Sequence, residues 1–424
     1  MAGLNLRKSV ANLIRPAGWL TSRRLGAHGT ILAVCLWSLY GWMLATPGLR
    51  DRNGILKGTD FLHLYTLGSL AAAHRGADLY DMNAQSLLAA QVLPQATGIR
   101  YLPLYPPQVS IVFMPLACLS YGWALVLWWG CSALVYGICC YSIWQACPSL
   151  RGVGGTVLIL AMAYPAFFHL IAWGQTSALA LGCFTLMFFA LRARREFLAG
   201  LILGCLIFKP QLGLAAAVIF VSLGAWETVA GAVFSAVAQL AVGVLYYGMQ
   251  PLRQWLLALA DVPAVLPWLE PRPYQTYSLR TFWSMLVPWP HFAFGLYGLS
   301  AIVVLGLTIA VWRHTVPLAL RYSALLLATV LVAPHFTVYD LVILAPAFLL
   351  LADLMAGQRD NRSPRWLGTI LYLIYTLPLL GPLSRWTHVQ LAVIAMTAGV
   401  YVVWRTGGRL ARVSRPESAE SVAK

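Results

Sequence analysis

The chain is poor in acidic residues and in charge as a whole. Of its 424 residues, 13 are Asp or Glu, and charged residues make up 10% of the sequence. Soluble domains carry about 25% charged residues, so this composition excludes an ordinary soluble protein. The scarcity of carboxylates also argues against an acid-rich metal cluster, and we expect no tightly bound metal.

The cysteines lack the spacing of a disulfide framework or a zinc site. All eight lie in or beside apolar runs, and no Cys-x-x-Cys occurs. Both kinds of site are therefore excluded, and the cysteines are best explained as small buried apolar side chains. The sequence also shows no short fixed repeat and no low-complexity tract.

Long apolar runs dominate what is present. Apolar residues make up 60% of the chain, and the mean hydropathy is +0.73. Since a membrane-crossing helix needs about 20 apolar residues, we predict an all-α polytopic membrane protein rather than a barrel. The predicted spans, about twelve in number, are 29–46, 108–146, 156–173, 176–191, 197–208, 211–224, 228–247, 291–312, 317–333, 340–355, 366–381 and 389–404.

Two of these runs have unusual lengths. Residues 108–146 are too long for one crossing and contain Pro115 and the break Ser120-Tyr121-Gly122. They form either one crossing or a short re-entrant piece followed by a crossing. Residues 197–208 are too short for a full crossing, which predicts that Lys209 at their end sits inside a membrane cavity.

The net charge of +16 follows the membrane topology. Basic residues concentrate in short loops and at both termini, as the positive-inside rule expects, and this argues against a nucleic-acid partner. We predict a basic cytoplasmic arm (1–28), one integral membrane catalytic domain (29–404) and a basic cytoplasmic tail (405–424). A chain rich in Arg and poor in Lys suits a bacterial inner membrane.

Two long loops are predicted on the outer side. The first, 47–107, contains two helix-like stretches, 60–75 and 81–93, which we expect to be interfacial helices. The second, 248–290, is rich in Pro, Trp and Tyr, which suits the membrane interface. Long outer loops beside short inner loops place the working surface outside the cytoplasm.

Asp60 is the leading functional candidate. A carboxylate beside a membrane segment is costly to dehydrate, so such groups are functional candidates by default. The alternative is a cap for a helix that starts at Phe61, because Asp is a preferred N-cap. His63 and Tyr65 follow closely and would share its site.

Lys209 is the second notable charge. A lysine at bilayer depth costs about 2.5–3.5 kcal/mol. It either extends to the interface or binds an anion, of which a lipid phosphate is the one that reaches this depth. Pro210 keeps its segment from forming a regular helix.

Further polar residues converge on the same side of the membrane. His335 is a phosphate ligand or an interfacial histidine, Asp340 a ligand or the cap of a helix starting at Leu341, and Arg280 a phosphate contact or an exposed arginine. The remaining candidates, which would contact sugar or acceptor, are Tyr105 in Tyr-Pro-Pro, Gln175 after Gly174, and Tyr339.

Taken in order, these motifs resemble a known family. An early Asp after the first membrane helix is followed by Gly-x-Asp-Leu-Tyr at 76–80, Tyr-Pro-Pro at 105–107 and Gly-Gln at 174–175. Ala-Gly-Leu-x-Leu-Gly at 199–204 then leads to Lys-Pro at 209–210, and Tyr-Asp-Leu follows at 339–341. This series is similar to glycosyltransferase family 87 of the GT-C superfamily, over about residues 29–355.

The resemblance implies a membrane enzyme that takes a sugar from a polyprenyl-phosphate donor outside the cytoplasm, most often mannose. The family's early catalytic base maps onto Asp60. One departure concerns the later motif, where members often have His directly before Tyr. Here Val338 stands at that position, and His335 lies three residues earlier.

The predicted reaction is glycosyl transfer with inversion. Asp60 would accept the acceptor's proton, and a phosphate can leave without an acid, so one carboxylate suffices. Lys209, with His335 or Arg280, would hold the lipid phosphate. No cofactor is expected, although a loosely held divalent ion between Asp60 and phosphate stays open. The alternatives are a flippase of a lipid-linked sugar and a surface-polysaccharide ligase or polymerase.

Overall fold

The computed structural model describes residues 20–357 and 366–413, and these residues form helices without any β-strand. The α-helices are α2 Ser22–Leu44, α3 Thr59–Ala72, α4 Met82–Val92, α5 Gln108–Ala117, α6 Tyr121–Gln145, α7 Gly154–Ala163, α8 Pro165–Trp173, α9 Ser177–Arg192, α10 Glu196–Gly204, α11 Leu214–Ser222, α12 Trp226–Tyr247, α13 Met249–Ala260, α14 Val262–Leu269, α15 Leu279–Leu286, α16 Pro290–Arg313, α17 Leu318–Val332, α18 Ala345–Gly357, α19 Leu367–Thr376, α20 Ser384–Thr387 and α21 Leu391–Val413. Short 3₁₀ turns are η1 Gly76–Tyr80, η2 Pro94–Ala96, η3 Pro148–Val153, η4 Cys205–Phe208, η5 Pro210–Leu212, η6 Pro273–Gln275, η7 Asp340–Leu344 and η8 Leu377–Leu383.

The helices confirm an all-α, multi-pass membrane protein. In the described ranges, seven helical stretches are long and apolar enough to cross a membrane. The pair Pro148–Ala163 and Pro165–Trp173, bent by 45°, raises the number to eight if it forms one span. Large apolar side chains on α2, α12 and α16 face outward, as lipid contact requires; examples are Ile31, Leu245 and Ile302.

The expected number of about twelve spans is not confirmed. Four apolar helices that fall within predicted spans have only 10–17 residues: Gln108–Ala117, Ser177–Arg192, Glu196–Phe208 and Leu318–Val332. Burial inside the protein explains their apolar sequence. In α17, every residue from Tyr322 to Val332 is buried, so hydropathy there reports contact with protein rather than with lipid.

The long run 108–146 splits in two, at the break that its sequence shows. The short helix α5 ends at Ala117, and the 25-residue helix α6 begins at Tyr121. α5 lies against α3, whereas α6 is long enough to cross. The structure therefore has the short piece followed by a full-length helix.

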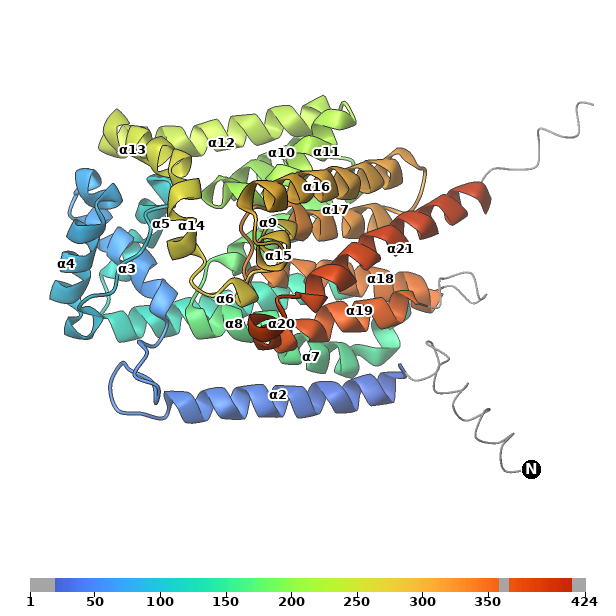
Figure 1. Ribbon diagram of the computed structural model, residues 1–424, viewed down its shortest axis with the longest axis horizontal. Coiled ribbons are helices and arrows are strands. Elements are labelled where there is room, and N and C mark those ends of the chain that lie inside the picture. Colours follow the sequence, from blue (N-terminus) through green and yellow to red (C-terminus); the bar gives the residue numbers. More distant parts are fainter. Residues whose placement is uncertain (1–19, 358–365, 414–424) are drawn as a thin grey trace, which may run out of the picture.

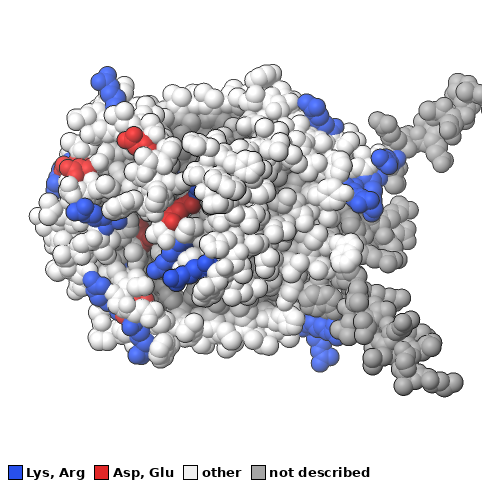
Figure 2. All heavy atoms as spheres, in the orientation of Figure 1, with Lys and Arg blue, Asp and Glu red and all other residues white. Residues whose placement is uncertain are grey.

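Charged side chains gather at the two ends of the molecule (Figure 2). On the face shown, Asp and Glu lie only toward the end that carries α3, α4 and α13, where Lys and Arg also lie. The opposite end, where α2 begins and α16 ends, shows Lys and Arg alone. The band between is free of charge, as a membrane-spanning region requires.

The first predicted outer loop is inserted into the protein body. Its helices α3 and α4 match the expected stretches closely, but every residue from Phe61 to Gly68 in α3 is buried. α5, α6 and α8 surround α3, so it packs against protein, and its expected place at the membrane interface stays a prediction. α4 is more exposed, through Leu87 for example, and the second loop exposes Leu257 and Trp268.

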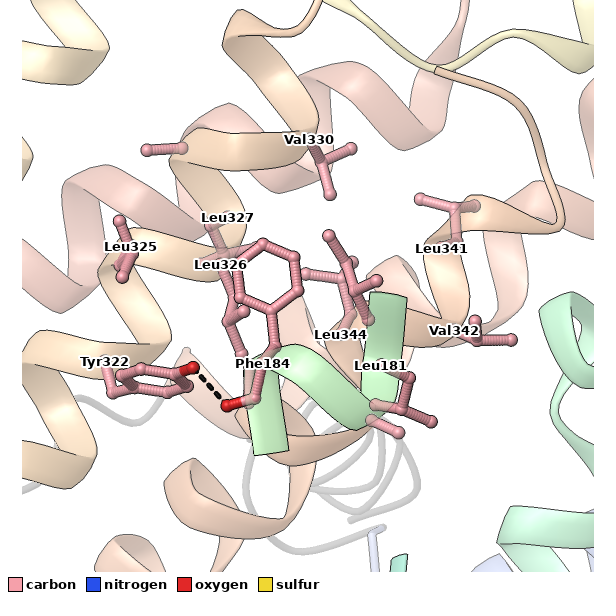
Figure 3. Packing of buried hydrophobic residues seen from close by; sticks show 14 of the residues in the cluster. Leu181, Phe184, Tyr322, Leu325, Leu326, Leu327, Val330, Leu341, Val342 and Leu344 are labelled. Carbon is pink, nitrogen blue, oxygen red and sulfur yellow. Dashed lines mark hydrogen bonds between the residues drawn. The ribbon is translucent and has the colours of Figure 1, made fainter. Parts of the chain in front are cut away.

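A buried apolar cluster joins α9, α17 and η7 (Figure 3). Leu181 and Phe184 of α9 lie against α17, and the hydroxyl of Tyr322 donates a hydrogen bond to the carbonyl of Phe184. Leu341 and Leu344 of η7 complete the cluster. This packing fixes the first residues of α9 and η7 relative to each other.

Parts of the predicted terminal segments lie outside the described residues. α2 already begins at Ser22, within the expected basic arm, and α21 continues to Val413, within the expected tail. Residues 1–19 and 414–424, and the predicted basic cluster Arg359, Arg362 and Arg365, are not described.

Candidate active site

Asp60 and Lys209 are joined through a single side chain, that of Gln175. The Nε2 atom of Gln175 donates to Oδ2 of Asp60 at 2.5 Å. The Oε1 atom of the same amide accepts from Nζ of Lys209 at 3.4 Å. The carboxylate and the ammonium group therefore belong to one site.

Two glycines bring Asp60 and Gln175 together. Gly58, the N-cap of α3, has φ +65°, and Gly174, which follows α8, has φ +71°. A Cβ at Gly174 would lie 2.8 Å from Cβ of Phe61, so glycine allows this loop to approach α3. Since α3 begins at Thr59 and its N-cap is Gly58, the capping interpretation of Asp60 is wrong.

Lys209 is buried and paired with Asp340. Its Nζ lies 2.8 Å from Oδ1 of Asp340 and 3.3 Å from Oγ of Ser177. The ammonium group also lies 5.1 Å from the ring centroid of Tyr339. Only 9% of the Lys209 side chain is exposed, so it does not extend to the interface.

Asp340 is held from several directions. Its Oδ2 accepts from the backbone nitrogen of Thr337 at 3.3 Å and from the hydroxyl of Thr337 at 2.9 Å. Ser177 donates to Oδ1 at 2.5 Å. The expected cap is wrong here too, because Tyr339 is the N-cap of η7 and Asp340 lies within its first turn.

Aromatic side chains line the site beside Asp60. The Tyr105 hydroxyl lies 3.4 Å from Oε1 of Gln175 and 3.3 Å from Oγ1 of Thr176. The ring of His63 stacks on Tyr101 at a centroid distance of 4.9 Å. Nε2 of His63 is buried and has no hydrogen-bond partner among the described residues.

Tyr65 is not brought into this site. Its hydroxyl donates to the carbonyl of Leu119 at 2.7 Å, and its ring contacts Phe61 and Tyr121 in the apolar core. Tyr65 thus belongs to the packing between α3 and α6 rather than to the polar group around Asp60.

Arg280 and His335 form a second charged cluster around Glu270, which sequence reasoning did not single out. Glu270 Oε1 accepts from Nη2 of Arg280 and lies 2.8 Å from Nδ1 of His335. Its Oε2 lies 3.3 Å from the hydroxyl of Thr281. A signal was present, because Glu270 is one of the few acidic residues and lies in a predicted outer loop.

A short backbone pairing places the Glu270 cluster beside the Lys209 site. Thr276 and Thr337 form an antiparallel bridge, and the nitrogen of Val338 donates to the carbonyl of Gln275 at 2.9 Å. The segment that carries His335 therefore also carries Thr337 and Asp340. Val338 itself, which occupies the position of the family's usual histidine, is buried.

Asp60 and Glu270, two buried carboxyls outside the spans, differ in acidity. Burial raises the pKa of Asp60 to about 6, against the lowering effects of the Gln175 hydrogen bond and the positive charge of Lys209. Burial alone would raise the pKa of Glu270 as well, but the His335 hydrogen bond and the charge of Arg280 outweigh it and lower that pKa. Asp60 is thus the better proton acceptor of the two.

The described part of the chain brings together no group of three or more His, Cys, Asp or Glu side chains that could hold a metal ion. Two carboxylates, Asp60 and Asp340, do lie in the same site. Each already has close hydrogen-bond partners, Gln175 for the first and Lys209 for the second.

Comparison with protein families gives one match. The model described as glycosyltransferase family 87 matches residues 104–335, more than half of the chain. Comparison with curated proteins and with solved structures finds no match. Asp60 and Asp340 fall outside the matched stretch, and the site residues inside it are Tyr105, Gln175, Lys209, Glu270, Arg280 and His335.

Proposed function

The chain belongs to glycosyltransferase family 87, and we propose that it transfers a sugar, with mannose as the favoured one, from a polyprenyl-phosphate donor to a lipid or glycan acceptor. The membership makes the protein a glycosyltransferase, which disfavours the flippase and ligase alternatives. The donor, the inversion of configuration and the side of the membrane are parts of our proposal.

The observation that carries the proposal is the contrast between Asp60 and Asp340. Asp340 is paired with an ammonium group at 2.8 Å, which makes it a weak base. Among the described residues, the side chain that bonds to the Asp60 carboxylate is the neutral amide of Gln175. With a pKa of about 6, Asp60 is ionised at neutral pH yet basic enough to take a proton.

The proposed reaction is a single displacement. The acceptor hydroxyl oxygen attacks the anomeric carbon, and its proton passes to the Asp60 carboxylate. The bond between the anomeric carbon and the phosphate oxygen breaks, and the electron pair leaves with polyprenyl phosphate. Attack from the face opposite the phosphate inverts the configuration, so no second carboxylate is needed.

The balance of charges supports a donor with one phosphate. Lys209 is matched by Asp340, and Arg280 by Glu270. His335 adds one positive charge when it is protonated. With the ionised Asp60 counted, these six side chains sum to zero even when His335 is protonated. A diester phosphate adds one negative charge to this site and a diphosphate adds more, so the diester costs less to bind.

The distribution of charge supports a site outside the cytoplasm. The end of the molecule opposite α3 and α13 shows only basic side chains on the face in Figure 2. The positive-inside rule assigns such an end to the cytoplasm. We propose a bacterial inner membrane as the location, with both termini inside and the lipid tail of the donor remaining in the bilayer.

The test is Asp60→Asn in the purified full-length protein, incubated with a panel of polyprenyl-phosphate sugars and an acceptor extract. Loss of the base should lower the rate of polyprenyl-phosphate release by about 10²–10⁴-fold, with folding unchanged. Asp261→Asn serves as the control, because Asp261 is exposed. If the Asp60→Asn variant works at near the original rate, Asp60 is not the base.

A further inference from the structure

We propose that Glu270 is a positioning residue for the donor phosphate, and that it acts by orienting Arg280 and His335. The inference rests on the proposed function. It adds a residue whose carboxylate holds two side chains from different segments of the chain, Arg280 in α15 and His335 in the segment before η7.

The exposure of the three side chains sets their order from the inside outward. The side chain of Glu270 is 5% exposed, that of Arg280 12% and that of His335 16%. The carboxylate is therefore the least exposed of the three groups. Because a carboxylate and a phosphate repel each other, we expect Arg280 and His335 rather than Glu270 to contact a bound phosphate.

The hydrogen bonds leave one nitrogen available on each of the two side chains. Nδ1 of His335 faces the Glu270 carboxylate, so it carries a proton and leaves Nε2 pointing away. Arg280 uses Nη2 for Glu270 and Thr281, and Nε for the carbonyl of Pro334. Among the described residues, neither Nε2 of His335 nor Nη1 of Arg280 has a hydrogen-bond partner. Nη1 offers a donor to a phosphate, and Nε2 offers a second one when the imidazole carries both protons.

The cluster lies close along the chain to the Lys209 site, so a donor phosphate held by Arg280 and His335 would lie near Lys209. Thr337 lies two residues after His335, so the Cα atoms of the two residues are at most about 7 Å apart. Thr337 bonds to Asp340, which bonds to Lys209. The bridge between Thr276 and Thr337 fixes this separation.

The main test is Glu270→Gln, assayed for donor and acceptor kinetics and for inhibition by polyprenyl phosphate. Loss of one charged hydrogen bond should raise the donor KM and weaken product inhibition by about tenfold or more, whereas kcat and the acceptor KM change less than threefold. Glu196→Gln is the matched control, because Glu196 is exposed in the first turn of α10. An equal rise in both KM values, or a donor KM within threefold of the original, overturns the inference.

A second variant covers a failure of Glu270→Gln to fold. Glu270→Asp keeps the charge but withdraws the carboxylate by one methylene, and it should give the same selective loss of donor affinity. In a double variant that carries Arg280→Ala and His335→Ala, adding Glu270→Gln should weaken donor affinity by less than a further twofold. A further tenfold loss there would show that Glu270 acts by another route.

Binding of polyprenyl phosphate, measured by tryptophan fluorescence without turnover, separates this inference from the proposed function. If no sugar donor is turned over but Glu270→Gln still weakens binding tenfold, the proposed reaction fails and Glu270 keeps its role. If transfer occurs and binding is unchanged by Glu270→Gln, or the original protein does not bind polyprenyl phosphate, the inference about Glu270 fails.

Discussion

Replacing Gln175 by Met tests whether this amide sets the basicity of Asp60. Gln175 donates to Oδ2 of Asp60 at 2.5 Å, and this bond lowers the pKa of the carboxyl, which stands at about 6. Met has nearly the same length as Gln but cannot donate. The Gln175→Met variant should therefore raise the pKa of Asp60 further.

The size of the effect follows from the strength of the lost bond. A hydrogen bond to a charged group contributes about 1.5–3 kcal/mol, which corresponds to about 1–2 pKa units. With a pKa of about 6, about nine-tenths of the Asp60 carboxyl is ionised at pH 7. In the variant this fraction should fall to between about one-half and one-tenth.

The assay is the pH dependence of kcat/KM for sugar transfer. Because the ionised form is the base, the rate should rise with pH through about 6 in the original enzyme, and the rise should move up by about 1–2 pH units in the variant. The variant should then regain most of its activity at alkaline pH. Gln239→Met is the matched control. The Gln239 amide donates to the backbone carbonyls of Gly204, at the end of α10, and of Ser235, within α12.

One result would refute the reasoning. If Gln175→Met lowers kcat/KM by the same factor at every pH, the amide does not tune the base, and its role is contact with substrate. If the profile moves down rather than up, the hydrogen bond does not stabilise the ionised form of Asp60.

Three further predictions concern the same site. Asp340→Leu should lower the free energy of unfolding by about 3–5 kcal/mol, because it leaves the Lys209 ammonium group buried without a counter-charge. Adding Lys209→Met should restore most of that loss, as measured by denaturant titration in micelles. If the second substitution restores nothing, the pairing is contradicted. Gly174→Ala should cost about 1–2 kcal/mol from its left-handed backbone alone and should reduce transfer further by crowding Phe61, whereas Gly152→Ala, where a Cβ meets nothing within 4 Å, should leave both stability and rate unchanged. Transfer should persist in excess EDTA, and a drop of more than about tenfold, or about 1.4 kcal/mol in barrier height, would assign a divalent ion to the reaction.

The sequence predicts the polar members of the site better than it predicts the membrane topology. Asp60, Gln175 and Lys209 interrupt apolar sequence, and buried polar groups of this kind must find partners. Their convergence therefore has a physical basis that is visible without a structure. The number of spans does not, because a helix such as α17 is equally apolar whether protein or lipid surrounds it.

Helical periodicity could have separated two of the candidates near Asp60. His63 lies three residues after Asp60, so both face the same side of α3. Tyr65 lies five residues after Asp60, which turns its side chain about 140° away at 3.6 residues per turn. The structure follows this spacing, because His63 stacks on Tyr101 beside Asp60 whereas Tyr65 points into the apolar core.

The pairing of Glu270 with His335 could not be predicted, because 65 positions separate them and no local pattern connects them. The bridge between Thr276 and Thr337 that places them together is a single β pairing, too short to leave an alternating signal in the sequence. In the later motif, His335 lies three residues before the position where family members often have histidine. In this structure the displaced histidine contacts Glu270.

The insertion of α3 among helices that follow it in the chain has a consequence for biosynthesis. Translation delivers Asp60 long before Gln175, Lys209 and finally Asp340, so α3 has no finished cavity to enter while the later helices are still at the ribosome. Until η7 arrives, the ammonium group of Lys209 has no carboxylate beside it. Nascent chains that end before α8 should thus expose α3 to protease and modification reagents, whereas the pairing of Lys209 with Asp340 should form only at a late stage of membrane integration.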